Sequence, residues 1–541
     1  MRTMNMKPLI ARAVLGTAFA LTSLLAFNAQ ASAPGITAAP FTGSTSTFNL
    51  SAAAAYISQP DGASIYSWGY GCTGGTATFA PAAITTGFCS TMQLPGPTLI
   101  VNQNDTVTVT LTNNLPAAAG NTSIMFPGFA VTATGGAPGV LTQEATHGGT
   151  VTYTFVASTP GTHSYYSGTR ANLQVEMGLY GALIVLPTLA SGLPTGYSQP
   201  TALPATCVVL GSKPTRAATD VDYRLAAAAY DNPAACYDRE YLVQLSEMDP
   251  AIHRQAEEQV LADQQKAQQC TAPTGCMVVA TEPYKPAYFL VNGRSMPDDM
   301  DPNYASQYPR QPYNGNPHMH PGELTLIRVI GQGRMQHPLH EHANHVRLLA
   351  RDGNMLLTST NKPAGPLLFT TTSTPGQTLD GIFQWTAKGL NWDVYAHADG
   401  ITVDTCVADA NGYYTTGSGA PTDAPNYYEW CADHKKPLEA KPFGNVASGG
   451  PVTLPDPGIV ANGPWYSGSP YLGPDANMRS VGPTPIPPFG TIANDPGSEA
   501  GFAFMWHSHN EREITTNNIF PGGMMMMMLV DPWVFSINEA N

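Results

Sequence analysis

The stretch Thr106-Val-Thr-Val-Thr-Leu-Thr112 alternates threonine with an aliphatic residue at every position. This period of two predicts a strand that buries its aliphatic residues on one face and turns its threonines to the other. Similar short runs, separated by turns rich in Gly, Pro and Asn, occur at residues 98–101, 151–156 and 181–186. Strands of this length and spacing predict an antiparallel β-sandwich between about residues 41 and 187.

A second region with the same character begins at Tyr288. Its short apolar runs predict a second sandwich, so the fold class expected for the chain is all-β. Residues from about 400 to 500 interrupt this region with Asn, Gly, Pro and Tyr, and we expect a loop-rich insertion there. The predicted strands of the second sandwich cover residues 288–293, 323–330, 346–350, 381–385, 502–506 and 524–530.

The segment between the two regions, residues 191–284, has a different composition and is expected to be a linker. Asp249-Pro250 is a helix start signal, because Asp caps a helix and Pro fits its first turn. The following residues, up to Gln268, are rich in Ala, Glu, Gln and Leu and predict one solvent-facing helix. Glu257 and Glu258 on it are typical of a solvated helix face.

The overall composition is that of a folded chain. Of the 541 residues, 43% are hydrophobic and 11% are charged, which excludes intrinsic disorder. The 52 glycines and 48 prolines indicate many turns and therefore short strands. A net charge of −14 argues against nucleic acid or an anionic membrane as a partner.

The N-terminus predicts export. A basic start is followed by the apolar run 13–27 and by Ala29-Gln30-Ala31, which offers small residues for cleavage. We expect residues 1–31 to be a signal peptide, and the mature chain to start at Ser32 in the periplasm or outside the cell. Removing the three basic residues of the signal would change the net charge to −17. No other apolar run reaches the roughly 18 to 20 residues that span a bilayer.

The eight cysteines predict disulfides rather than a metal site. An even number in an exported chain indicates four bonds, and none of the spacings is C-x-x-C. Because neighbours in the sequence close the shortest loops, we expect the pairs 72–89, 207–236, 270–276 and 406–431.

Histidines gather in two clusters of the C-terminal region, at residues 337–345 and 507–509. Residues two apart on a strand share a face, so His340 and His342 point the same way, as do His507 and His509. If the two strands are neighbours, four imidazoles converge. Such a set, without a thiolate, favours a borderline transition metal over calcium or magnesium. Ser508 would then face the other way, towards His337.

Several of these motifs resemble the multicopper oxidases, enzymes built from cupredoxin β-sandwiches. Leu94-Pro-Gly-Pro-Thr-Leu-Ile-Val101 and Gly178-Leu-Tyr-Gly-Ala-Leu-Ile-Val185 are similar to the opening and closing parts of the family's first domain. His337-Pro-Leu-His340-Glu-His342 resembles its HPxHLH element, and His507-Ser508-His509 its HCH element. The resemblance implies tandem cupredoxin-type domains, bound copper, and oxidation of a substrate coupled to reduction of oxygen.

The sequence also departs from the family pattern. In the family, the first domain supplies histidines to a three-copper cluster, and the type 1 copper needs a cysteine thiolate. Ser508 stands at the position of that cysteine, and no histidine follows it between residues 510 and 523. The resemblance therefore implies fewer coppers than in a four-copper laccase. The first-domain histidine positions are occupied by Met125, Pro127, Tyr166 and Gly168.

Four further groups each admit two interpretations. His345 is either a fifth imidazole or a donor behind the ligands, and we favour the latter. His318 and His320 share a face and either form an incidental surface pair, which we favour, or supply extra ligands. The run Met524–Met528 either offers a copper(I) site or packs in the core, which is the better expectation because Met fills gaps. The turn at residues 511–513 supplies either a carboxylate behind the site or a solvated salt bridge.

Taken together, the sequence predicts a signal peptide at 1–31, an N-terminal cupredoxin-like domain at 32–190, a linker at 191–284 and a C-terminal cupredoxin-like domain at 285–541. The expected function is that of a copper-binding oxidoreductase with a small-molecule or metal-ion substrate. The alternative is a periplasmic copper carrier or a catalytically silent relative. The predicted metal ligands are His337, His340, His342, His507 and His509.

Overall fold

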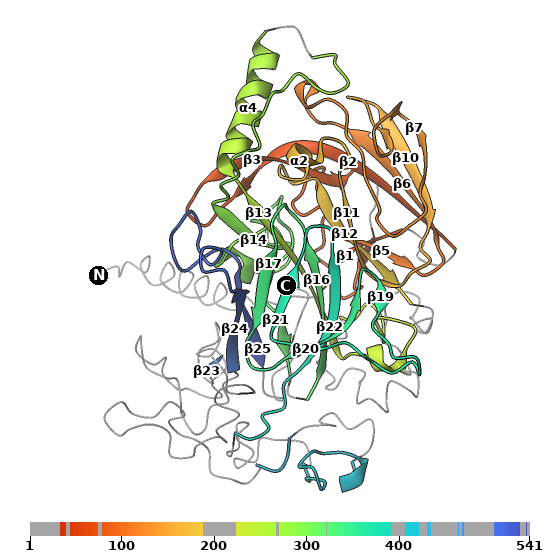
Figure 1. The fold of residues 1–541 in the computed structure, drawn as a ribbon, viewed down its shortest axis with the longest axis vertical. Helices are drawn as coiled ribbons and strands as arrows, with labels where there is room; N and C mark the ends of the chain where they lie inside the picture. The colour runs from red at the N-terminus through yellow and green to blue at the C-terminus, as the bar shows by residue number, and fades with distance from the viewer. Residues whose placement is uncertain are drawn as a thin grey trace, which may run out of the picture.

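The computed structural model describes most of the two predicted sandwiches. It covers residues 33–38, 44–73, 78–187, 223–266, 270–320, 322–390, 406–420, 430–433, 464, 468–469, 502–530 and 537. The predicted signal peptide and most of the predicted insertion lie outside these residues. Figure 1 shows a first β-rich unit stacked on a second, with a long helix beside the first.

The first sandwich contains, among the described residues, two sheets of five strands. One has the order β11-β12-β5-β1-β4 and the other β3-β2-β6-β10-β7. The strands are β1 (Gly35–Thr37), β2 (Thr45–Ser58), β3 (Ser64–Cys72), β4 (Thr78–Ala80), β5 (Leu99–Asn102), β6 (Thr106–Asn113), β7 (Thr132–Gly135), β10 (Thr150–Val156), β11 (Gly161–Tyr166) and β12 (Tyr180–Leu186). A small hairpin, β8 (Ala137–Pro138) with β9 (Gln143–Glu144), and the short helix α2 (Ala171–Gln174) complete this unit.

Strand β6 behaves as its alternation predicts. Val107, Val109 and Leu111 are fully buried in the sandwich core, while its threonines lie on the more exposed face. The prediction of a purely antiparallel sandwich was wrong in one respect. Strand β6 is antiparallel to β10 but parallel to β2, because the chain crosses between sheets before it returns beside an earlier strand.

The predicted helix is α4 (Pro250–Gln265), and the Asp249 side chain accepts a hydrogen bond from the backbone N–H of Ala251 at its start. It is not simply solvent-facing. Ile252, Ala256 and Val260 pack into the core of the first sandwich, whereas Glu258 is exposed. The helix therefore covers one end of the first sandwich (Figure 1).

The second sandwich contains, within the described ranges, a seven-stranded and a six-stranded sheet. The first has the order β14-β13-β16-β22-β18-β19 with β20 on β18, and the second the order β15-β25-β24-β17-β21 with β23 on β24. The strands are β13 (Arg239–Met248), β14 (Tyr288–Val291), β15 (His318–Met319), β16 (Leu324–Gly331), β17 (His337–Glu341), β18 (Val346–Arg351), β19 (Asn354–Met355), β20 (Leu367–Leu368), β21 (Thr370–Ser373), β22 (Thr378–Gln384), β23 (Gly468–Ser469), β24 (Phe502–Ser508) and β25 (Met525–Val530).

The prediction that residues 191–284 form a linker was wrong for strand β13, which lies within this range. Residues 239–248 form a fully buried strand that pairs with β16 and β14 inside the second sandwich. A strand buried on both faces has no alternating pattern, which explains why the sequence did not reveal it. The second sandwich therefore begins before residue 285, and the predicted linker 191–284 contains part of its core.

The two sandwiches meet through β11 and β22. The Thr162 hydroxyl donates to Asp380 Oδ1 at 2.6 Å, and the Thr378 hydroxyl donates to the Thr162 carbonyl at 2.6 Å. Arg328 donates to the Thr162 hydroxyl and forms a buried ion pair with Glu240 at 2.9 Å. These buried polar contacts fix how the first sandwich sits on the second.

Three of the four predicted disulfides are confirmed. Their Cα atoms lie 5.6–5.8 Å apart, within the usual range for a bonded pair. Cys236 is disulfide-bonded, and its predicted partner Cys207 lies outside the described residues. The confirmed pairs are Cys72–Cys89, Cys270–Cys276 and Cys406–Cys431. None of the helices in the described ranges is long and apolar enough to cross a bilayer.

We predict that the oxidised protein contains no free thiol, because each described cysteine is disulfide-bonded. Thiol titration in denaturant without reductant should give zero groups per chain, and the same titration after reduction should give eight. Two reactive thiols before reduction would contradict the pairing of Cys207 with Cys236.

Candidate metal centre

The four predicted ligand histidines of β17 and β24 come together on one face of the six-stranded sheet. Strands β17 and β24 are antiparallel neighbours, with His340 directly opposite His507. Directly opposite residues share a face, and His342 and His509, two positions further along their strands, lie on that face too. The backbone N–H of His509 donates to the Pro338 carbonyl at 2.8 Å and so continues the ladder.

The rings of these four residues, the histidine cluster, lie close to one another. The His340 centroid is 4.9 Å from that of His342, 4.8 Å from that of His509 and 5.6 Å from that of His507. The rings of His342 and His507 lie 5.1 Å apart. His340, His342 and His507 are buried, whereas His509 is exposed. The cluster is therefore reachable from solvent at one corner.

Hydrogen bonds set the direction of two of the rings. The His507 Nδ1 lies 2.7 Å from the Ser508 carbonyl oxygen, which can only accept, so Nδ1 carries the proton. His507 in its neutral form therefore presents a lone pair on Nε2. His340 Nδ1 contacts the Thr370 hydroxyl at 2.8 Å. Such contacts hold an imidazole in place behind a metal.

The environment of two of these imidazoles, His340 and His507, favours their neutral form. Burial, followed by the neighbouring imidazoles of His509 and His507, lowers the pKa of His340. Burial also lowers the pKa of His507. Neutral imidazole is the form that binds a metal.

The His342–His507 pair fits a metal ion. Its two Nε2 atoms lie 3.2 Å apart, close to the separation expected for two imidazoles on one ion with bonds of about 2.0–2.1 Å. Across the described residues, however, no three His, Cys, Asp or Glu side chains are already arranged as a ready ligand set. Binding an ion would therefore require the other two rings to turn towards the pair.

His345 lies outside the histidine cluster. Its ring packs against Phe369 at 5.2 Å, and Phe369 in turn packs against His340 at 5.6 Å. The aromatic ring of Phe369 thus stands between His345 and the cluster.

His337 lies on the other face of β17 and is not a member of the cluster. Its Nε2 is 2.8 Å from Glu247 Oε2, and its Nδ1 is 2.9 Å from Glu513 Oε2. Ionised carboxylates only accept hydrogen bonds, so both ring nitrogens carry protons and His337 is an imidazolium. It has no lone pair for a metal, and the prediction that His337 is a ligand is not supported.

We call His337, Glu247, Glu513 and Ser508 the acid cluster. Ser508 donates from its hydroxyl to Glu513 Oε2 at 2.5 Å, so it faces His337 as predicted. Burial lowers the pKa of His337, but the hydrogen bonds to Glu247 and Glu513 outweigh it and raise the pKa to about 9. The position expected to resemble a type 1 copper site thus holds a buried ion cluster.

A third buried carboxyl, that of Glu176, extends the acid cluster. Tyr284 donates from its hydroxyl to Glu176 Oε2 at 2.6 Å and lies 3.0 Å from Glu247 Oε1. Burial raises the pKa of Glu176 to about 8, so this group is protonated at neutral pH.

Sequence reasoning named three members of the acid cluster, without seeing that they form one, and missed the fourth, Glu247. Glu247 lies on β13, the strand assigned to the linker, and contacts His337 only in the folded chain. Glu513 was one of two open interpretations of the turn at residues 511–513. It is fully buried, whereas Glu511 and Arg512 are exposed.

The first-domain positions expected from the family lie apart from the histidine cluster. Met125 and Tyr166 form a backbone bridge, so the two elements that carry these positions are neighbours, as the resemblance implies. Tyr166 lines a cavity of about 360 Å³ together with Gln332 and Arg334. None of the four cluster histidines lines that cavity.

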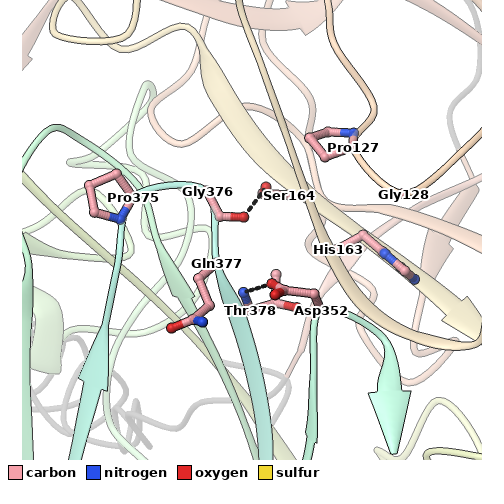
Figure 2. Close-up of a pocket in the computed structure, with 9 residues that line it drawn as sticks. All are labelled: Pro127, Gly128, His163, Ser164, Asp352, Pro375, Gly376, Gln377 and Thr378. Atoms are coloured by element: carbon pink, nitrogen blue, oxygen red, sulfur yellow. Dashed lines mark hydrogen bonds between the residues drawn. The ribbon is translucent and has the colours of Figure 1, made fainter.

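A second cavity of about 340 Å³ lies between the sandwiches (Figure 2). Pro127 of the first sandwich lies across it from the loop around Gly376, and the Ser164 hydroxyl donates to the Gly376 carbonyl at 3.2 Å, whereas the His163 ring points away from that loop. Its described lining includes a single histidine, His163, so it does not offer an imidazole set.

Two other predictions can be settled. His318 and His320 are buried, so the expected surface pair was wrong; His320 Nδ1 lies 3.2 Å from Arg239 Nη2. Within the run Met524–Met528, alternate residues pack in the sandwich core, as expected for a final strand.

We predict that His337→Gln lowers the free energy of unfolding by about 3–5 kcal/mol at pH 6.5, since it leaves buried carboxylates without their cation. The pKa of His337 in the folded state is raised to about 9, above its ordinary 6.5. Its stabilising contribution is therefore complete below pH 6.5 and is lost as the pH rises through about 9.

Chemical denaturation between pH 6 and 10 measures this effect. The parent should lose stability across that range, and His337→Gln should lose less. His163→Gln is the control, because this buried histidine contacts a carbonyl rather than carboxylates. Equal pH slopes for the parent and His337→Gln would contradict the assignment of an imidazolium.

Known proteins are similar in sequence to part of the first sandwich. A family model described as multicopper oxidase matches residues 74–189. Multicopper oxidase MCE from Talaromyces pinophilus is 36% identical over 98 residues, which is 18% of this chain and 15% of that protein. Laccase abr2 from Aspergillus fumigatus is 39% identical over 98 residues, 18% of this chain and 16% of that protein. The match thus spans about one sixth of the length of these relatives.

Solved structures of low sequence identity also align. A multicopper oxidase called mgLAC covers 91% of this chain and 88% of its own, with 15% identity and a TM-score of 0.41. A blue copper oxidase from Nitrosomonas europaea covers 89% and 85%, with 14% identity and a TM-score of 0.42. On the family model and the curated relatives, residues 74–189 of this chain are similar to multicopper oxidases.

Proposed function

We propose that this chain is an exported copper-binding oxidoreductase of multicopper-oxidase type with a reduced copper complement. The observation that carries the proposal is the convergence of His340, His342, His507 and His509 on one face of two paired strands. Bound copper would supply one-electron redox chemistry at this face. A small organic molecule or a metal ion would be the electron donor, and oxygen the acceptor.

The chain's own residues would perform three tasks there. His342 and His507 would hold the ion through Nε2, since these atoms already lie 3.2 Å apart. Thr370 and the Ser508 carbonyl would orient the rings of His340 and His507 from behind. His509, the exposed member of the cluster, would mark the side from which a substrate approaches.

Two features support a reduced copper complement. The residues at which the resemblance implies a type 1 copper form the acid cluster: Ser508 offers no thiolate, and His337 is hydrogen-bonded to carboxylates through both nitrogens. The first-domain positions hold Met125 and Tyr166 instead of imidazoles. This is not the residue set of a four-copper laccase.

A copper carrier, or a catalytically silent relative, is the second candidate. The same absence of a thiolate favours it, because a type 1 site is the usual entry for electrons in the family. Oxygen uptake by the copper-loaded protein with phenols or reduced metal ions distinguishes the two. Turnover above that of free copper supports the oxidoreductase, and tight binding without turnover supports the carrier.

We predict that changing any one of the four cluster histidines to Ala weakens copper(II) binding by at least about tenfold, since even a residue behind a ligand is worth 10- to 100-fold. His147 is exposed, and His147→Ala is the matched control, which should bind copper(II) as tightly as the parent does. Copper titration after circular dichroism has confirmed the fold measures the effect. Parent-like affinity in all four variants would rule out the cluster as the copper site.

A separate prediction concerns colour. The copper-loaded protein should lack the intense absorption of a thiolate–copper bond in the red part of the visible spectrum, because Ser508 cannot supply a thiolate. An optical spectrum recorded during copper loading tests this. A strong blue colour would show that a cysteine binds copper and would contradict the prediction, since every described cysteine is disulfide-bonded.

A further inference from the structure

The sheet face that carries the histidine cluster also carries methionines. Strand β25 is the antiparallel neighbour of β24, with Met525 directly opposite His507 and Met527 directly opposite Met505. Directly opposite residues have Cβ atoms about 4.5–5.5 Å apart on the same face. The sheet therefore places three thioethers beside the imidazoles.

The register forms a continuous row across three strands. His340 on β17 is opposite His507 on β24, and His507 is opposite Met525 on β25. Met505 and Met527 form the adjoining row, two positions along each strand. We call Met505, Met525 and Met527 the outer methionines.

The other methionines of β25 serve a different purpose. Met524, Met526 and Met528 are 0–1% exposed and pack in the core of the second sandwich. The outer methionines lie on the opposite face, where Met505 and Met527 are partly exposed and Met525 is buried. Core packing thus explains one half of the methionine run and leaves the other half to be explained.

We propose that the outer methionines, together with His507, bind a soft monovalent cation of the copper(I) class. Thioethers select copper(I), and imidazole accepts either copper state. The inference rests on the proposed function, because it extends the histidine cluster. It adds that this face binds the reduced ion through sulfur, whereas the oxidised ion depends on the imidazoles.

The chemistry of the donors gives this site its selectivity. Sulfur and neutral nitrogen donors bring no negative charge, so they favour a polarisable ion of low charge over a hard divalent one. Met is also unbranched and adaptable, so its thioether can turn towards an ion at this partly exposed face of the sheet.

The experiment compares two double variants of the same strand. Met525→Leu/Met527→Leu removes two outer thioethers, and Met526→Leu/Met528→Leu removes two inner ones; Leu conserves volume, so both should fold. Affinities are measured for copper(I) under anaerobic conditions with a competing chelator, for silver(I) as a redox-inert probe, and for copper(II). We expect the outer variant to lose at least about tenfold in copper(I) and silver(I) affinity, about 1.4 kcal/mol, with little change for copper(II). The inner variant should match the parent.

The outcomes separate this inference from the proposed function. Parent-like copper(I) and silver(I) affinity in the outer variant, with copper(II) binding still dependent on the histidines, would overturn the thioether site alone. Absence of binding of either copper state by the parent would overturn both. As a second measurement, silver(I) should shift the methyl resonances of the outer methionines in the parent and leave those of Met526 and Met528 unshifted. Unshifted outer methyl groups would also overturn the inference.

Discussion

The pairing of β17 with β24 is the constraint on which both buried clusters depend. With Leu339 opposite Ser508 and His340 opposite His507, the pleat sends His340, His342 and His507 to the outer face and His337 and Ser508 to the inner one. A shift of one residue would exchange these faces and place an unpaired imidazole among the aromatic residues of the core. The register thus places the histidine cluster and the acid cluster on opposite faces of the same sheet.

The acid cluster shows how a site can keep its position and change its chemistry. An imidazole between two carboxylates is held as a cation, since both hydrogen bonds favour the protonated ring. Such a group stabilises buried carboxylates but has no lone pair for copper. Ser508 donates a hydrogen bond to Glu513 and offers no thiolate to a metal. The buried ion pairs on the inner face of this sheet therefore contribute to stability.

The histidine cluster and the outer methionines share the opposite face of the sheet. This face therefore carries nitrogen donors beside sulfur donors. Imidazoles of β17 and β24 lie on one side and thioethers of β24 and β25 on the other. A single sheet face can in this way provide separate preferences for two oxidation states of one metal. The inner methionines of the same strand, buried beside Trp506, belong to the hydrophobic core instead.

Patterns of residues close together in the chain were enough to predict many of the strands and three of the disulfides. The alternation in β6, the H-x-H spacings and the short loops between cysteines predicted the strands, the shared faces and three disulfides, because each depends on residues near one another in the chain. Only the tertiary structure decided the rest. Glu247 reaches His337 across 90 residues through a strand whose uniform burial leaves no pattern in the sequence. The charge of His337, and hence its loss as a ligand, is set by that partner and by Glu513, which are brought together only when the sheets pack.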